Sequence, residues 1–175
     1  AARRAGVAVL ADGIGQMQRQ FELLTEEGLP ASRIVLGHCD DGRGADTARD
    51  IGFAERGAWI AYDHIGWETG FPHAMPDEAR AAQVAKLVAA GFADRLLLSC
   101  SVIGTGLGMP ASRHRYSHLL ESFVPRLAKA GVGESTIHTL LVDNPRRLLS
   151  PVEPESRDTS RLHEFAQGFR LMKAT

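Results

Sequence analysis

The fold class follows from the segment Arg33-Ile34-Val35-Leu36-Gly37-His38-Cys39-Asp40-Asp41, in which an apolar run leads directly into a group of polar side chains. A continuous run of β-branched residues and leucine is typical of a strand in a parallel sheet, because both faces of such a sheet are covered. A helical pattern follows from about residue 45 to residue 56 and ends at Gly57. The segment therefore predicts one strand–helix unit, with polar side chains at the carboxyl end of its strand.

The same succession of strand and helix occurs on both sides of this unit. Apolar runs at 7–10, 58–62 and 95–98 predict three further strands. Helical patterns follow them at 17–27, 78–90, 114–130 and 134–142, with Asp77 expected as an N-cap and a break expected at Asn144-Pro145. Four strand–helix units in a row predict an α/β fold with parallel strands.

Composition and charge indicate one globular domain and exclude two classes of partner. The 175 residues are 44% hydrophobic and 23% charged, which is enough to build a buried core. The net charge of −1 removes the electrostatic basis for nucleic-acid binding. No apolar run approaches the roughly 20 residues that span a bilayer, so no membrane partner is expected. Without a signal-peptide pattern, and with only Cys39 and Cys100, which we expect to be small buried hydrophobes, the sequence favours a cytoplasmic location.

Two regions of different character divide the chain. We expect a β/α domain over residues 1–150, followed by a linker and a short C-terminal helix over 151–175. Pro151 and Pro154 mark the linker, and apolar residues at helical spacing follow it. The chain begins with Ala1-Ala2-Arg3-Arg4 and has no initiator methionine, so we also expect a processed or truncated piece of a longer protein.

Polar side chains follow each predicted strand at the point where the strand ends. They are Asp12, the run from His38 to Asp41, Asp63-His64 and the run from Ser99 to Ser101. Because the carboxyl ends of parallel strands meet at one edge of a sheet, we expect these groups to converge. An imidazole at such an edge can ligate a divalent metal, and a carboxylate can bind metal or relay protons. A single histidine near a strand end is more often structural, but His38 and His64 lie one βα unit apart, which favours a metal site.

Several separated motifs resemble the phosphotriesterase-related branch of the amidohydrolase superfamily. They are the segment 33–41, the segment Gly57-Ala58-Trp59-Ile60-Ala61-Tyr62-Asp63-His64-Ile65-Gly66, and the stretches 116–127 and 143–149, within a similarity that runs from about Gly6 to Ser150. The resemblance implies a (β/α)8 TIM-type barrel with two divalent metals, usually zinc, bridged by a carboxylated lysine and a hydroxide that attacks a phosphoester or lactone. It also implies that this chain supplies the second half of the barrel, strands five to eight.

The resemblance carries over to four residues of this chain. His38 matches the metal ligand of strand six, and Asp41 and His64 match an outer proton relay. Trp67 falls where the family lines its leaving-group pocket, although an ordinary core or rim aromatic is an equally good interpretation of this residue.

Two positions depart from the family pattern. Asp12 stands at the position of the strand-five histidine, where its carboxylate is able to replace an imidazole as a metal ligand. Ser101 stands where the family has the strand-eight aspartate, and a neutral hydroxyl is a poor ligand and a poor proton acceptor. The sequence therefore predicts a hydrolase of the phosphotriesterase-related type with impaired activity. The alternative is a non-catalytic, degenerate relative that serves as a binding or assembly scaffold.

The remaining predictions concern assembly and two sets of residues without a catalytic assignment. Half a barrel leaves two strand edges unpaired, so we expect a homodimer. The glycine-rich segment 104–109 resembles a dinucleotide loop, but Met109 replaces the third glycine and a loop over the barrel mouth is the better interpretation. His114, His118 and His138 are expected to be surface or interhelix residues on the predicted helices.

Overall fold

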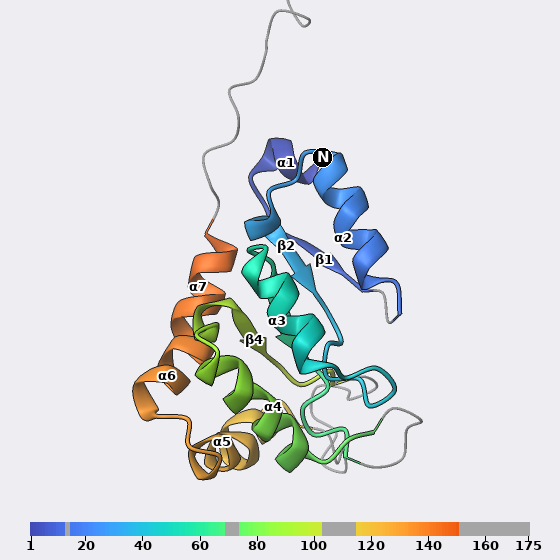
Figure 1. The fold of residues 1–175 in the computed structure, drawn as a ribbon. Coiled ribbons are helices and arrows are strands. Elements are labelled where there is room, and N and C mark those ends of the chain that lie inside the picture. Colours follow the sequence, from blue (N-terminus) through green and yellow to red (C-terminus); the bar gives the residue numbers. More distant parts are fainter. Residues whose placement is uncertain (13–14, 69–73, 103–114, 151–175) are drawn as a thin grey trace, which may run out of the picture.

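A four-stranded parallel sheet forms the centre of the molecule. The computed structural model describes residues 1–12, 15–68, 74–102 and 115–150 (Figure 1). Its strands are β1 (Val9–Ala11), β2 (Ile34–Leu36), β3 (Trp59–Tyr62) and β4 (Leu96–Leu98). They lie side by side in chain order, so β1 and β4 are the edges of the described sheet. The predicted α/β fold with parallel strands is confirmed.

Helices connect consecutive strands, as a parallel sheet requires. These are α2 (Met17–Glu26), α3 (Thr47–Glu55) and α4 (Asp77–Ala89). A short helix that the sequence did not predict, α1 (Ala2–Ala5), precedes β1, and the 3-10 turns η1 (Ala31–Arg33) and η2 (Ala93–Arg95) lead into β2 and β4. The side chain of Asp46 stabilises the start of α3, because it accepts hydrogen bonds from the amides of Ala48 and Arg49.

After β4 the chain forms two helices of mixed type. The first joins the π turn η3 (Leu119–Phe123) to α5 (Val124–Lys129). The second joins α6 (Glu134–His138), the π turn η4 (Thr139–Asp143) and α7 (Asn144–Leu149). Pro125 and Pro145 lie in the first turns of α5 and α7, where the wider π turn before each of them accommodates the missing N–H. The predicted break at Asn144-Pro145 is therefore wrong, because the chain stays helical through it.

The two faces of the sheet pack against hydrophobic clusters of different size. One face packs into the main core through Ile34, Leu36, Ile60, Tyr62, Leu96 and Leu98, on the side where α3 and α4 lie (Figure 1). The opposite face carries a small cluster of Val35, Trp59 and Ala61. On this opposite face at the β1 edge, Leu10 pairs with Val35 in the sheet register and is 61% exposed. Side chains alternate along each strand, which explains why neighbours in sequence belong to different clusters.

The start of α4 differs from the prediction. Pro76 occupies the N-cap position and Asp77 is the first residue of the helix, so the prediction of Asp77 as an N-cap is wrong. Its carboxylate instead accepts hydrogen bonds from the amide of Gly66 and from Nη1 of Arg80, both at 3.0 Å. The residue fits the sequence pattern of a cap but serves a tertiary contact.

Some of the predictions concern segments outside the described residues. These segments are 151–175, with the expected linker and terminal helix, the glycine-rich loop at 104–109, and His114. Among the described residues, no helix combines the length and the apolar character needed to cross a membrane.

Candidate active site

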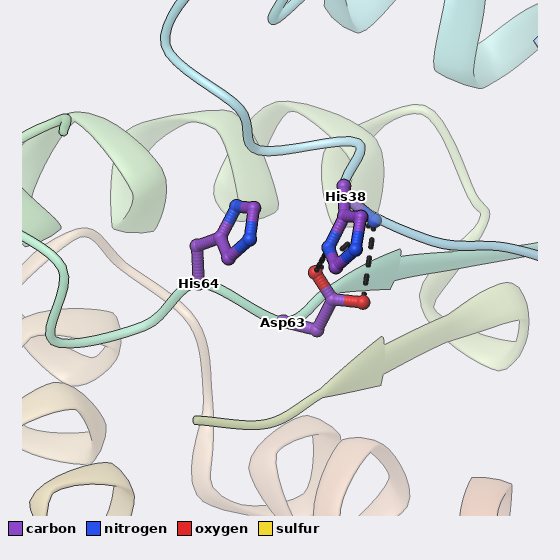
Figure 2. A group of neighbouring side chains, drawn as sticks. All are labelled: His38, Asp63 and His64. Carbon is purple, nitrogen blue, oxygen red and sulfur yellow. Dashed lines mark hydrogen bonds and ion pairs between the residues drawn. The ribbon is translucent and has the colours of Figure 1, made fainter. Parts of the chain in front are cut away.

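His38 follows β2 in an unusual backbone conformation. Its φ is +57°, and it is the one non-glycine residue with positive φ in the described part of the chain. A left-handed conformation is costly for a residue with a β-carbon, and strain of this kind is concentrated at functional sites. The bend turns the His38 ring back toward the carboxyl end of β3, where Figure 2 shows it beside Asp63 and His64.

Two carboxylates flank the His38 ring. Nδ1 of His38 lies 2.8 Å from Oδ1 of Asp63, and Nε2 lies 3.1 Å from Oδ1 of Asp12. The backbone amide of His38 also donates to Asp63, at 3.1 Å from Oδ1 and 3.2 Å from Oδ2. Asp63 therefore fixes both the backbone and the ring of His38 (Figure 2), while Asp12 reaches the other ring nitrogen from β1's end of the sheet.

The two carboxylates favour the protonated ring. The hydrogen bond with Asp63 raises the pKa of His38 from 6.5 to about 9; burial opposes this shift, and the negative charges of Asp63 and Asp12 add to it. At neutral pH, His38 is an imidazolium held between two anions. A divalent cation bound at Nε2 would replace that proton, because a metal requires a ring nitrogen with a free lone pair.

His64 lies parallel to His38. The ring centroids are 4.3 Å apart and the planes differ by 2°, while Trp67 stacks near the other side of His64 with a centroid distance of 4.9 Å. Burial lowers the pKa of His64, and the charge of His38 acts in the same direction. One member of the stacked pair is thus charged and the other neutral at pH 7, a separation typical of acid–base sites.

Asp40 binds the backbone of the segment that carries Asp63 and His64. Its carboxylate is fully buried and accepts hydrogen bonds from the amide of Asp63 at 3.1 Å, from the amide of His64 at 3.0 Å and from Nε of Arg80 at 2.8 Å. Burial and the charge of Asp63 raise the pKa of Asp40 to about 6, against the effect of Arg80. The sequence analysis expected Asp40 and Asp63 among the converging polar groups but gave neither an individual role. It did not single out Arg80, because nothing in the spacing of these residues reveals their contacts.

The carboxylate of the predicted relay residue Asp41 is buried and binds a neighbouring arginine. It accepts hydrogen bonds from the amide and Nε of Arg43, each at 3.0 Å, and from Nη2 at 3.2 Å. The negative charge of Asp41 favours protonation of His64, but it is a smaller influence than burial. The relay of Asp41 and His64 stays a prediction.

Trp67 and Ser101 line a small pocket beside the stacked rings. Nε1 of Trp67 donates to the carbonyl oxygen of Ser101 at 2.7 Å, and the amide of Ser101 donates to the carbonyl oxygen of Asp63 at 2.8 Å. The pocket is lined by Ile65, Gly66, Trp67, Cys100, Ser101, Val102, Arg115 and His118. A substrate-binding role for Trp67 stays a prediction, although its place on a pocket wall is compatible with one.

The two cysteines have the character of apolar residues. Cys39 is fully buried and Cys100 is partly buried. Burial raises the pKa of the Cys39 thiol and raises that of Cys100 to about 11, so both remain protonated at neutral pH. A thiol, unlike a thiolate, is a poor metal ligand.

Glu68, Asp77 and His118 form a second group of neighbouring ionisable side chains. Nε2 of His118 lies 2.7 Å from Oδ2 of Asp77, and Glu68 accepts the Asp77 amide at 3.2 Å. Asp77 is fully buried, and its other oxygen is held by Gly66 and Arg80. With a guanidinium 3.0 Å away, this group suits a hydrogen-bond network better than a cation. His118, expected as a surface or interhelix residue, thus binds a buried carboxylate.

The donor set at the sheet edge fits part of a metal centre. His38, Asp63 and His64 offer ligand atoms that all lie within 4.8 Å of one another. Asp63 already binds Nδ1 of His38, which leaves Nε2 of His38 and the Asp12 carboxylate as the pair of donors that face each other. A histidine ligand that is oriented by a carboxylate on its second nitrogen is the usual arrangement in metalloproteins. Zinc commonly takes four ligands, so these two donors make up half of a coordination shell.

Known proteins are similar to this chain in both sequence and fold. The model of the phosphotriesterase family matches residues 3–149. A phosphotriesterase homology protein of Mycobacterium tuberculosis is 30% identical over 140 residues, which make up 74% of this chain and 40% of that protein. An aryldialkylphosphatase of Saccharolobus solfataricus is 29% identical over 140 residues, or 75% of this chain and 43% of that protein.

Solved structures give the same result. The fold is similar to that of a mutant phosphotriesterase-like lactonase of Deinococcus radiodurans, with a TM-score of 0.70 and 31% sequence identity over 85% of this chain and 49% of that chain. The chain thus spans less than half the length of these relatives.

Proposed function

The chain belongs to the phosphotriesterase family, and from this membership we propose that it carries part of the catalytic centre of a metal-dependent hydrolase. Its substrates would be small esters, lactones or organophosphates, in keeping with the aryldialkylphosphatase and the lactonase that it resembles. The observation that carries the proposal is the geometry of His38, whose Nε2 lies 3.1 Å from Asp12 while Asp63 holds Nδ1 at 2.8 Å.

We assign His38 and Asp12 as the ligands that this chain offers to a divalent metal, with zinc as the first candidate. Asp63 orients the His38 ring and increases the basicity of its nitrogen. When bound, such a metal would polarise the substrate and supply an activated water. The other ligands of a binuclear centre would come from the half of the barrel that completes this one.

We assign the proton-transfer role to His64 together with Asp41. Burial lowers the pKa of His64, so its neutral ring is able to accept a proton near pH 7. Ser101 lines the small pocket next to Trp67, and its hydroxyl is a poor proton acceptor. For this reason we propose that catalysis is impaired in this chain.

We propose that the sheet is the second half of a (β/α)8 barrel, with residues 1–150 as its β/α unit. No further strand pairs with β1 or with β4 in the described sheet, and the exposed Leu10 is a residue of β1. A second copy of the chain would supply four further strands and cover this face. Sedimentation that gives a monomer at micromolar concentration would contradict the homodimer.

The alternative function, a binding or assembly scaffold without catalysis, rests on Asp12 and Ser101. These residues replace the histidine and the aspartate that the family resemblance leads one to expect. A scaffold would keep the fold and lose tight metal binding.

Zinc stoichiometry separates the two functions. We expect purified chain, incubated with zinc and freed of excess, to retain metal, and the variant His38→Ala to lose it. His138→Ala is the matched control, since that ring is 61% exposed and its nitrogen contacts only Asp143 among the ion pairs described. A folded wild-type chain that retains no zinc would favour the scaffold.

A further inference from the structure

The backbone that carries Asp63 and His64 is held by two buried carboxylates. Asp40 accepts hydrogen bonds from the amides of Asp63 and His64, and Asp77 accepts one from the amide of Gly66. Both carboxylates are fully buried. The segment 63–67, which forms one wall of the candidate active site, is thus fixed at three of its amides by charged groups from outside the segment.

Arg80 joins these two carboxylates. Its Nε donates to Oδ2 of Asp40 at 2.8 Å, and its Nη1 donates to Oδ1 of Asp77 at 3.0 Å. Nη2 donates to the carbonyl oxygen of Trp67 at 3.3 Å, and Nη1 also donates to the carbonyl oxygen of Met75. The side chain of Arg80, a residue of α4, has no exposed surface.

Stability alone is a weak explanation for this arrangement. Removing charges from water is costly, and apolar residues of similar volume often replace a buried ion triad without loss of stability. The triad does provide a fixed geometry, because a guanidinium is planar and binds two acceptors at set angles. Here the two carboxylates that Arg80 holds also accept the backbone amides of the segment 63–67, which carries the stacked His64.

We propose that Arg80 is a positioning residue for the active site: by bridging Asp40 and Asp77, it fixes the segment 63–67 and so sets how Asp63 and His64 meet His38. The proposal deepens the proposed function, on which it rests for its metal readout. Asp77 also contacts His118, which directly precedes η3. This contact connects the buried ion pairs of Arg80 to the segment that follows β4.

The test compares Arg80→Lys with Arg33→Lys. A lysine at 80 keeps the positive charge but presents a single ammonium that is unable to span both carboxylates. Arg33 is the matched control, because it is also buried but binds the carbonyl oxygens of Leu148 and Ser150 at the opposite end of β2. Both variants replace the guanidinium of one buried arginine by a single ammonium group.

Two quantities are measured on folded protein. In Arg80→Lys we expect the amides of residues 63, 64 and 66 to exchange with solvent at least about tenfold faster relative to the amides of β2, and zinc affinity to fall about tenfold, as for other outer-sphere supports of a ligand. In Arg33→Lys we expect neither change. Unaltered relative exchange at these three amides in Arg80→Lys would overturn the proposal.

The outcomes also separate this proposal from the proposed function. If the wild-type chain binds no zinc, the metalloenzyme assignment fails, and the exchange of the three amides still tests the role of Arg80. If Arg80→Lys does not fold, the pair Asp40→Asn/Arg80→Gln removes one anion and one cation together and gives the same exchange measurement. Normal exchange in that folded pair would likewise overturn the proposal.

Discussion

The two ends of the central strands use buried polar residues in different ways. At the amino end, Nδ2 of Asn144 donates to the carbonyl oxygens of Ala93 and Leu96 at 2.8 and 2.7 Å, and Nη1 of Arg33 donates to those of Leu148 and Ser150 at 2.9 and 3.1 Å. Each of these side chains donates to two backbone carbonyl groups. The hydrogen bonds of Asn144 and Arg33 therefore stabilise the fold at this end.

At the carboxyl end, charged side chains meet one another instead. His38 lies between two carboxylates, and Arg80 joins two more. The hydrogen bond with Asp63 raises the pKa of His38 to about 9, while burial lowers the pKa of His64. The polar residues thus have different partners at the two ends, backbone carbonyls at one and charged side chains at the other. This contrast agrees with the general division in β/α barrels between a stabilising end and a catalytic end.

The largest effect that the comparison predicts is for Asp40→Ala. The substitution leaves two amides without an acceptor and the buried Arg80 without its Asp40 partner, so we expect a loss of about 3–5 kcal/mol in the free energy of unfolding. Urea denaturation measures it. Asp40→Asn keeps an oxygen for the amides and should lose less than half as much. Equal losses would mean that the amide contacts contribute nothing.

At the other end, Asn144→Ala should lower stability by about 2–3 kcal/mol, because two carbonyl groups lose their donor. Zinc affinity at the same fraction of folded protein should not change, since the strand separates Asn144 from the site. Isothermal titration of the variant measures the affinity. A weaker zinc affinity would show that the two ends of the strands are coupled and that the contacts of Asn144 do not serve stability alone.

Asp63→Asn should produce the opposite pattern. The amide oxygen of asparagine still accepts the His38 backbone N–H, but the protonated His38 ring loses its anionic partner, so we expect a loss of about 1–2 kcal/mol in the free energy of unfolding. Zinc affinity should fall about 10- to 100-fold, because a neutral amide is a weaker partner for Nδ1 of the ligand histidine. Asp46→Asn is the control and should leave the affinity unchanged, because the Asp46 carboxylate accepts hydrogen bonds from the amides of Ala48 and Arg49 in the α3 cap. Unaltered affinity in Asp63→Asn would separate Asp63 from metal binding.

The smallest effect concerns pH. The pKa of His38 is raised from 6.5 to about 9, so its protonated form stabilises the metal-free fold fully below about pH 6.5 and less as the pH rises through 9. We expect the free energy of unfolding to fall by about 1–2 kcal/mol over this interval, allowing for the solvated Asp12. Denaturation at a series of pH values measures it, and the slope should be smaller in His38→Gln. An identical slope would mean that other groups control it.

The strands, the main helices and the edge of the sheet where the polar side chains converge were predicted from the sequence. Apolar runs such as Ile34-Val35-Leu36 and the polar residues directly after them are local signals, and the parallel order of strands then brings Asp12, His38 and His64 to one place. Sequence reasoning did not find the partner of each side chain. Asp77 has the pattern of a helix cap, yet its carboxylate binds Gly66 and Arg80.

Local pattern and family resemblance therefore suffice for the α/β architecture of this chain and for the kinds of group at its sheet edge. The tertiary structure alone sets which of these groups touch. Asp40 and Arg80 are 40 residues apart in sequence, and Asp77 and His118 are 41 apart, so their contacts depend on how α4 and η3 pack against the sheet. Such contacts shift the pKa of each ring and set the position of each polar side chain, because both depend on distances of a few ångströms that residue type and spacing do not encode.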